Sequence, residues 1–267
     1  MPYLLFVNFY SIFINFNSKI FLTDPSSVNT DFDTKLVRIL RLLETKITLK
    51  LIKNFDSFVV LSPGLIKYYD LNPESCTIIP GFYNFNNVAY EFKYSSDTKF
   101  IISYAGSLSD KYGLPILDKL AGITNDSNFI VKVAGKVSEN QKKNYPNIKF
   151  VCFLNGKNYT TFMNQSHLFI NPRNPLDLFT NYSFPSKMFE YVSFKRPILS
   201  SDLSSIPKDF KDKIVTFENY NAEEIFNKIL LIRDNYEYYS KQAIKLSEYC
   251  FHEYSEDSLY KKINLNK

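Results

Sequence analysis

A proline, a lysine and a glutamate occur at helical spacing in segment 182–191, which reads Tyr-Ser-Phe-Pro-Ser-Lys-Met-Phe-Glu-Tyr. Pro185 suits the first position of a helix, because its fixed φ fits the helix and its missing N–H removes no hydrogen bond. The unpaired N–H groups of a first turn attract anions, and Lys187 would add a positive charge. The spacing therefore predicts a phosphate site at the start of a helix over 185–194.

The same segment places a carboxylate near the predicted phosphate. Ser186 and Glu190 are four residues apart, so they share one face of the helix. A diphosphate held near Ser186 and Lys187 would leave the hydroxyl groups of a sugar close to Glu190. The alternative is an ordinary packed helix, with Met188 and Phe189 in the core and the charged side chains in solvent. The spacing alone leaves both interpretations open.

The composition argues against several other kinds of site. A chain of 267 residues suffices for one large or two modest domains. The net charge of +5 comes from dispersed basic residues, so no basic stripe predicts binding to nucleic acid. The three cysteines are far apart and there are two histidines. We therefore expect no disulfide, no metal site and a reducing compartment, the cytoplasm.

The first 22 residues are apolar, which raises the question of a signal peptide or a membrane anchor. Asn8, Ser11 and Asn15 interrupt the apolar run over 3–16, and neither a basic leader nor a cleavage site is present. The run is also shorter than the roughly 20 apolar residues that a spanning helix needs. We expect a core helix here, followed by a strand over 19–23.

Apolar runs and helical patterns alternate along most of the chain, which predicts an α/β fold with a mainly parallel sheet. In the first part the predicted strands are 20–22, 57–61 and 76–79, and the predicted helices are 34–55 and 63–71. After the polar segment 84–97, predicted as a linker, the predicted strands are 99–104, 129–133, 149–153, 168–171, 197–200 and 214–217. The predicted helices of this second part are 114–120, 138–143, 159–164 and 185–194, with two or three more over 222–263.

Small and basic residues follow the predicted strands at their carboxyl ends, where open parallel sheets bind ligands. Gly106 and Ser107 follow the first strand of the second part, and Lys111 lies in the same loop. These small residues would let the backbone approach a phosphate closely. Arg173 follows another strand and could pair bidentately with phosphate. An ordinary βα turn and a surface arginine remain open alternatives.

Taken together, these segments resemble the family-4 (group 1) retaining glycosyltransferases of the bacterial surface-polysaccharide type. The resemblance covers about residues 57–217 and is carried, in order, by segments 102–108 with Tyr112 and Gly113, 133–136, 169–173 and 182–202. It implies the GT-B fold, an α/β arrangement of two facing Rossmann-like domains.

The resemblance also implies a division of the chain. Residues 98–250 would form the Rossmann-like domain that binds the nucleotide-sugar donor. Residues 1–83 would be an incomplete amino-terminal, acceptor-side domain whose first part is missing, and 84–97 would be the linker. The carboxyl-terminal helix, 251–267, would pack back on the amino-terminal domain.

The resemblance implies roles for particular residues. In such enzymes the second glutamate of a Glu-x7-Glu motif holds the donor ribose, and Glu190 stands at that position. Tyr182 replaces the first glutamate, which usually contacts the donor sugar. The resemblance therefore does not identify which sugar the donor carries. Ser107 stands where an arginine is expected, which leaves phosphate neutralisation to lysine and arginine side chains without a divalent metal or other cofactor. The residues expected to bind the donor are Gly106, Ser107, Lys111, Arg173, Ser183, Phe184, Ser186, Lys187 and Glu190.

The implied function is a hexosyltransferase-type glycosyltransferase in cell-surface polysaccharide synthesis. It would move a sugar, with retention, from a nucleotide-diphosphate sugar to a saccharide or lipid-linked acceptor. We expect a cytoplasmic protein, with peripheral contact to the inner membrane face as an option for lipid-linked acceptors. Two alternatives stay open: a donor-binding fragment or split-enzyme subunit whose amino-terminal half is a separate chain, and a nucleotide-sugar epimerase. The motifs do not identify catalytic residues.

Overall fold

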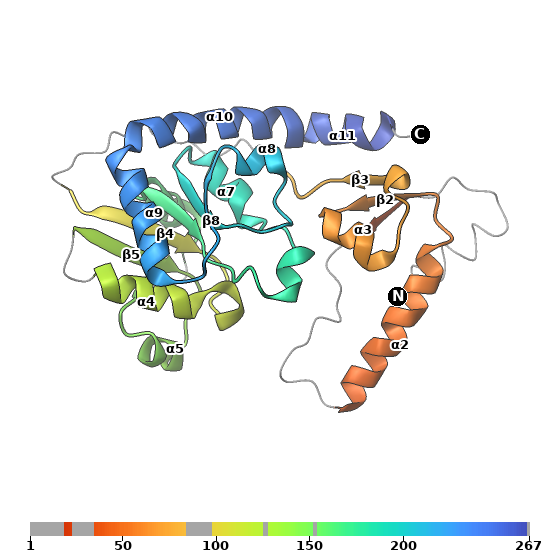
Figure 1. Cartoon of the computed structure of the whole chain (residues 1–267), viewed down its shortest axis with the longest axis horizontal. Helices are drawn as coiled ribbons and strands as arrows, with labels where there is room; N and C mark the ends of the chain where they lie inside the picture. The colour runs from red at the N-terminus through yellow and green to blue at the C-terminus, as the bar shows by residue number, and fades with distance from the viewer. Residues whose placement is uncertain (1–18, 23–34, 84–97, 125–127, 152–153, 266–267) are drawn as a thin grey trace.

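The computed structural model describes residues 19–22, 35–83, 98–124, 128–151 and 154–265. It shows two α/β parts, a small amino-terminal one and a larger carboxyl-terminal one (Figure 1). The helix expected over 3–16 and the linker expected over 84–97 lie outside the described residues. Among the residues described, no helix is both long enough and apolar enough to cross a membrane.

The amino-terminal part contains a three-stranded parallel sheet in the order β1-β2-β3. Its strands are β1 (Lys19–Leu22), β2 (Ser57–Val60) and β3 (Cys76–Ile78). Its helices are α2 (Lys35–Ile52) and α3 (Pro63–Tyr69), and a short 3-10 turn spans Pro73–Ser75. Buried apolar side chains hold this part together, among them Ile52 of α2, Val60 of β2 and Leu65 of α3. Each of these strands and α-helices lies within a few residues of its predicted range, whereas the 3-10 turn was not predicted.

The carboxyl-terminal part contains a six-stranded, entirely parallel sheet in the order β6-β5-β4-β7-β8-β9. The strands are β4 (Phe100–Ala105), β5 (Phe129–Ala134), β6 (Lys149–Val151), β7 (Leu168–Asn171), β8 (Ile198–Ser201) and β9 (Val215–Phe217). The chain moves outward from β4 in one direction through β5 and β6, and then in the other through β7, β8 and β9. Open parallel sheets bind ligands at such a reversal, beside the carboxyl ends of the strands.

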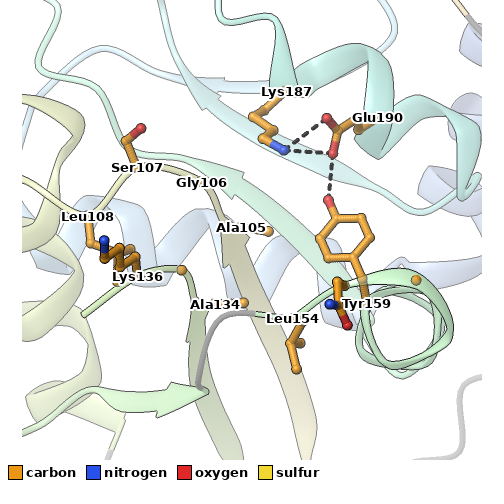
Figure 2. A pocket seen from close by; sticks show the side chains of 13 residues that line it. Ala105, Gly106, Ser107, Leu108, Ala134, Lys136, Leu154, Tyr159, Lys187 and Glu190 are labelled. Carbon is orange, nitrogen blue, oxygen red and sulfur yellow. Dashed lines mark hydrogen bonds and ion pairs between the residues drawn. The ribbon is translucent and has the colours of Figure 1, made fainter.

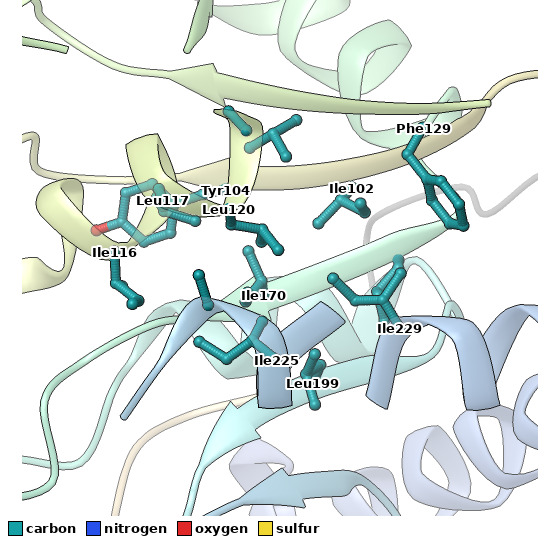
Figure 3. Close-up of a cluster of buried hydrophobic side chains, with 14 of the residues drawn as sticks. Ile102, Tyr104, Ile116, Leu117, Leu120, Phe129, Ile170, Leu199, Ile225 and Ile229 are labelled. Carbon is teal, nitrogen blue, oxygen red and sulfur yellow. The ribbon is translucent and has the colours of Figure 1, made fainter. Parts of the chain in front are cut away.

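Helices cover both faces of this sheet. The helices are α4 (Leu114–Thr124), α5 (Glu139–Asn144), α6 (Gly156–Asn164), α7 (Lys187–Ser193), α8 (Lys208–Lys211), α9 (Ala222–Asp234), α10 (Tyr236–Tyr254) and α11 (Glu256–Leu265). On one face α4 and α9 pack over the strands, as Ile102, Leu117 and Ile225 show (Figure 3). On the other face the core draws on α6, α7 and α10. The predicted α/β fold with a parallel sheet is confirmed.

The last two helices reach from the carboxyl-terminal part to the amino-terminal part (Figure 1). The Tyr83 amide donates to the Tyr254 carbonyl at 2.9 Å, and the Tyr83 hydroxyl lies 2.8 Å from the Ser247 hydroxyl. On α11, the Ile263 carbonyl accepts a hydrogen bond from the Lys19 amine. The described contacts between the two parts therefore include hydrogen bonds to both α10 and α11.

A second contact joins the start of α3 to the loop before α7. The Ser62 hydroxyl donates to the Tyr182 carbonyl at 2.5 Å. The rings of Tyr68 and Tyr182 meet edge to face, with centroids 5.1 Å apart. A Cβ atom at Gly64 would lie 1.9 Å from the Asn181 carbonyl oxygen, so this approach requires glycine. Tyr182 thus joins the two parts of the molecule.

Candidate functional site

A pocket of about 850 Å³ lies at the carboxyl ends of β4 and β5 (Figure 2). This size falls within the range of small-molecule sites, about 300 to 1,000 Å³. The wall is formed by two strand-end loops, the start of α6 and the first turn of α7. Its residues are Ala105, Gly106, Ser107, Leu108, Ala134, Gly135, Lys136, Leu154, Asn155, Gly156, Tyr159, Lys187 and Glu190.

Two glycines bring the strand-end loops together on this wall. The Gly106 amide donates to the Ala134 carbonyl at 3.1 Å. A Cβ atom at Gly135 would lie 2.4 Å from the Gly106 carbonyl oxygen and 2.7 Å from Leu108 Cγ. Glycine at position 135 is therefore needed for the two loops to pack, and the packing leaves backbone and small side chains facing the pocket.

An ion pair on α7 forms one side of the pocket (Figure 2). Lys187 Nζ lies 2.8 Å from Glu190 Oε1 and 2.9 Å from Oε2. The two residues are three positions apart and so face the same side of the helix. The two side chains are 43% and 41% exposed, so water screens the pair and both charges remain accessible to a ligand. The pocket therefore offers one cation and one carboxylate side by side.

A tyrosine from α6 meets this ion pair. The Tyr159 hydroxyl donates to Glu190 Oε2 at 2.6 Å. Burial, followed by the hydrogen bond and the charge of Glu190, raises the pKa of Tyr159 well above its ordinary value. The phenol therefore keeps its proton at neutral pH and acts as the donor in this bond.

Helix α7 begins at Lys187, two residues later than predicted. The Pro185 carbonyl accepts a hydrogen bond from the Met188 amide at 2.8 Å, and the Ser186 carbonyl accepts one from the Phe189 amide at 3.2 Å. These bonds span three residues, so 185–186 form a tight turn that leads into the helix. The exposed Ser186 side chain lies outside the pocket wall.

Four of the nine predicted donor residues lie on the pocket wall: Gly106, Ser107, Lys187 and Glu190. The other five lie outside it: Lys111, Arg173, Ser183, Phe184 and Ser186. A role in donor binding remains a prediction for all nine. Phe184 is buried against Phe189 and Phe210, with ring centroids 5.1 and 5.9 Å away.

Arg173 and Lys111 form a separate group on the loops after β7 and β4. Arg173 Nη1 donates to the Ser183 carbonyl at 3.2 Å. The Arg173 guanidinium carbon lies 5.3 Å from the centre of the Tyr112 ring. Lys111 Nζ lies 4.2 Å from the centre of the Phe179 ring. Both cations therefore rest on aromatic rings, in contacts typical of cation–π pairs.

Sequence reasoning did not assign a binding role to several residues of the wall. Lys136 was recognised as part of a strand-end turn, but Asn155, in the connection from β6 to α6, and Tyr159, on α6 itself, were not singled out. Gly156 and Lys157 follow Asn155, but they form no recognisable phosphate-loop pattern. The rule that ligands bind at the carboxyl ends of parallel strands could have identified this connection. As for metals, the described part of the chain contains no group of three or more His, Cys, Asp or Glu side chains placed to hold an ion.

Comparison with known proteins identifies a family and a fold. The sequence model of the family described as "Glycosyl transferases group 1" matches residues 89–249. Among solved structures, S. aureus TarM has a TM-score of 0.69 at 17% identity, over 95% of this chain and 51% of TarM. The chain thus spans about half the length of TarM. No curated protein matches the sequence.

Two further solved structures show the same fold. Anabaena HepE in complex with UDP and glucose has a TM-score of 0.67 at 11% identity, over 98% of this chain and 74% of HepE. The lipopolysaccharide outer core galactosyltransferase WaaB has a TM-score of 0.64 at 13% identity, over 99% of this chain and 72% of WaaB. These likenesses confirm the predicted α/β fold of the GT-B kind with a Rossmann-like parallel sheet.

Proposed function

This chain belongs to the family Glycosyl transferases group 1, and from that premise we propose that its pocket binds a nucleotide-diphosphate sugar as glycosyl donor. The sugar then passes, with retention at the anomeric carbon, to a saccharide or lipid-linked acceptor. The observation that carries the proposal is the Lys187–Glu190 pair on the pocket wall. An ammonium suits the diphosphate, and a carboxylate accepts hydrogen bonds from ribose hydroxyl groups.

The rest of the wall supports this assignment. Gly106 and Ser107 line the pocket, where their small size lets a phosphate approach the backbone closely. Lys136, on the neighbouring loop after β5, adds a second cation to the wall. As the sugar leaves, negative charge grows on the departing diphosphate, and these fixed positive groups stabilise it. HepE, which shares the fold, was solved with UDP and glucose bound.

The proposed donor class, biological role and location rest on the resemblance of segment 182–187, Tyr-Ser-Phe-Pro-Ser-Lys, to bacterial surface-polysaccharide transferases. On this basis the proposed donor is a hexose nucleotide, and the proposed role is polysaccharide synthesis in the cytoplasm. A lipid-linked acceptor would bring peripheral contact with the inner membrane face. The proposal includes no cofactor, because lysine side chains neutralise the negative charge of the phosphates.

One observation favours a second candidate function. The chain spans about half the length of TarM and three-quarters of HepE, at 51% and 74% of those chains. The second candidate is donor binding without sugar transfer by this chain alone. The two candidates share the pocket and differ in whether purified protein alone transfers sugar.

Calorimetric titration with UDP, GDP, ADP and CDP tests the proposal. We expect one of them to bind, and Glu190→Ala to weaken that binding by about tenfold or more with an unchanged melting temperature. Glu248→Ala, on an exposed glutamate away from the pocket, serves as the control and should bind like the wild type. If the wild type binds none of the four, the proposal is wrong. Sugar transfer by the purified chain then distinguishes the first candidate from the second.

A further inference from the structure

Tyr159 links two walls of the pocket through a single short bond. It stands in the first part of α6, and its hydroxyl reaches across to Glu190 on α7 (Figure 2). A 2.6 Å bond from a phenol to a carboxylate is a charge-assisted hydrogen bond, roughly twice as strong as one between neutral groups. The other partner of Glu190, Lys187, lies on the same helix. Among the residues that the structure describes, the tyrosine is therefore the one side chain from another element that hydrogen-bonds the carboxylate.

The two partners of Glu190 differ in how easily a ligand displaces them. Lys187 is 43% exposed and holds Glu190 through an ion pair that water screens. A phosphate in the pocket competes directly for its ammonium group. Tyr159 is a protonated phenol without charge, so a phosphate exerts no comparable attraction on it. The Tyr159 bond is thus the contact that persists when the pocket fills.

An ionised carboxylate accepts about four hydrogen bonds. In the structure Lys187 engages both oxygens and Tyr159 engages Oε2. Withdrawal of the ammonium towards a phosphate leaves about three acceptor positions free, and a ribose diol needs two of them. The tyrosine determines which way those positions face, because it fixes one oxygen from the α6 side.

Resting on the proposed function, we propose that Tyr159 is a positioning residue for donor recognition. It orients the Glu190 carboxylate so that the free acceptor positions meet the two vicinal hydroxyls of the donor ribose. Tyr159 therefore contributes to affinity through the sugar hydroxyls of the nucleotide and not through its phosphates.

The test compares ribose and dideoxyribose ligands on wild type and Tyr159→Phe. The probes are the nucleoside diphosphate that the wild type binds among UDP, GDP, ADP and CDP, and its 2′,3′-dideoxy form, both followed by calorimetry. We expect Tyr159→Phe to weaken binding of the ribose form by roughly tenfold and that of the dideoxy form by less than about twofold. Tyr145→Phe is the matched control, since its hydroxyl also lies 2.6 Å from a carboxylate, that of Asp110, and it lies outside the pocket wall.

A second measurement separates positioning from a loss of folding. In the Glu190→Gln background, Tyr159→Phe should cause no further selective loss, because the carboxylate that it orients is gone. Equal losses for the ribose and dideoxy forms overturn the positioning role while leaving the proposed function intact. A wild type that binds none of the four diphosphates overturns both.

Discussion

The Tyr191 hydroxyl holds both backbone polar groups of Ala105. It accepts a hydrogen bond from the Ala105 amide at 3.0 Å and donates one to the Ala105 carbonyl at 3.2 Å. The Tyr191 ring is buried and stacks on Phe169, with centroids 4.7 Å apart. Ala105 ends β4 on the pocket wall, and Tyr191 follows Glu190 on α7. This one side chain therefore fixes two walls of the pocket relative to each other.

Tyr191→Phe should destabilise the protein by about 1 to 3 kcal/mol, because it removes a hydroxyl that hydrogen-bonds both the buried N–H and the buried C=O of Ala105. The ring and its stacking on Phe169 are kept, so the loss reports the hydrogen bonds. Urea unfolding, followed by circular dichroism, measures the free energy of unfolding and its slope with denaturant.

Tyr238→Phe is the control for this change. The Tyr238 side chain is 58% exposed, so removal of its hydroxyl should alter the free energy of unfolding by less than about 0.5 kcal/mol. If both variants lose the same amount, the bonds to Ala105 do not stabilise the fold.

A second prediction concerns the contact between the two parts of the molecule. Alanine at position 64 would place its Cβ atom 1.9 Å from the Asn181 carbonyl oxygen. Since backbone on both sides must move, Gly64→Ala should destabilise by about 1 to 3 kcal/mol. Differential scanning calorimetry measures the loss, and limited proteolysis should cut the variant faster near residue 181.

A helical glycine without such a neighbour gives the opposite expectation. In α4, a Cβ atom at Gly122 would meet only the Asn147 side chain at 3.4 Å, an ordinary contact. Gly122→Ala should therefore leave stability unchanged or raise it by up to about 1 kcal/mol, through helix propensity. If Gly122→Ala destabilised the protein as much as Gly64→Ala does, crowding at Asn181 would not be the cause of the loss of stability.

The fold could be predicted from the sequence because its signals are local. Buried parallel strands such as β4 and β7 are mostly apolar, and the helices between them show helical spacing. Strand order, however, depends on contacts far apart in sequence. The start of α7 was predicted two residues too early. The carbonyl groups of Pro185 and Ser186 accept hydrogen bonds from the amides three residues later, as in a turn, where the sequence pattern favours an α-helix.

The candidate site was only partly predictable, for a related reason. Gly106 and Lys187 reach the pocket because strand ends and a helix start converge there, which follows from the topology. The side chain of Arg173 instead turns to Ser183 and to aromatic rings, a choice that depends on packing around Phe179. Tyr159 has no motif of its own, and its bond to Glu190 is set by tertiary structure.

A further prediction concerns the loss of stability at acid pH, to which we expect His167 to contribute. This side chain is 4% exposed, and its Nδ1 accepts a hydrogen bond from the Ile101 amide at 2.9 Å. Burial, with the nearby charges of Arg196 and Lys132, lowers the pKa of His167 from 6.5 to about 4. As the pH falls through 6.5 towards 4, the unfolded chain takes up a proton that the folded chain resists. His167 should therefore lower stability by up to about 3 kcal/mol over this window, with no penalty above it.

His167→Asn tests the predicted fall in stability at low pH. The asparagine Oδ1 keeps a hydrogen-bond acceptor near the position of Nδ1, but the side chain does not titrate. The free energy of unfolding, measured in urea at pH 7 and at pH 5, should fall less for the variant than for the wild type. If the free energy of unfolding falls equally for the wild type and the variant between pH 7 and pH 5, His167 is not the source of the pH dependence.

The last prediction concerns the charge of Lys187, whose ammonium lies 2.8 Å from Glu190 Oε1 on the pocket wall. Lys187→Met keeps an unbranched apolar stem and removes the charge. If the ammonium binds phosphate, the variant should bind the preferred nucleoside diphosphate roughly tenfold more weakly, while the parent nucleoside changes by less than about twofold. Added salt should narrow the difference, since exposed charges are screened within about 8 Å at physiological ionic strength. Lys241→Met removes a similar lysine from an exposed ion pair with Glu237, outside the pocket wall, and should bind both ligands like the wild type. Equal losses for diphosphate and nucleoside would instead mean that Lys187 acts only through its pair with Glu190.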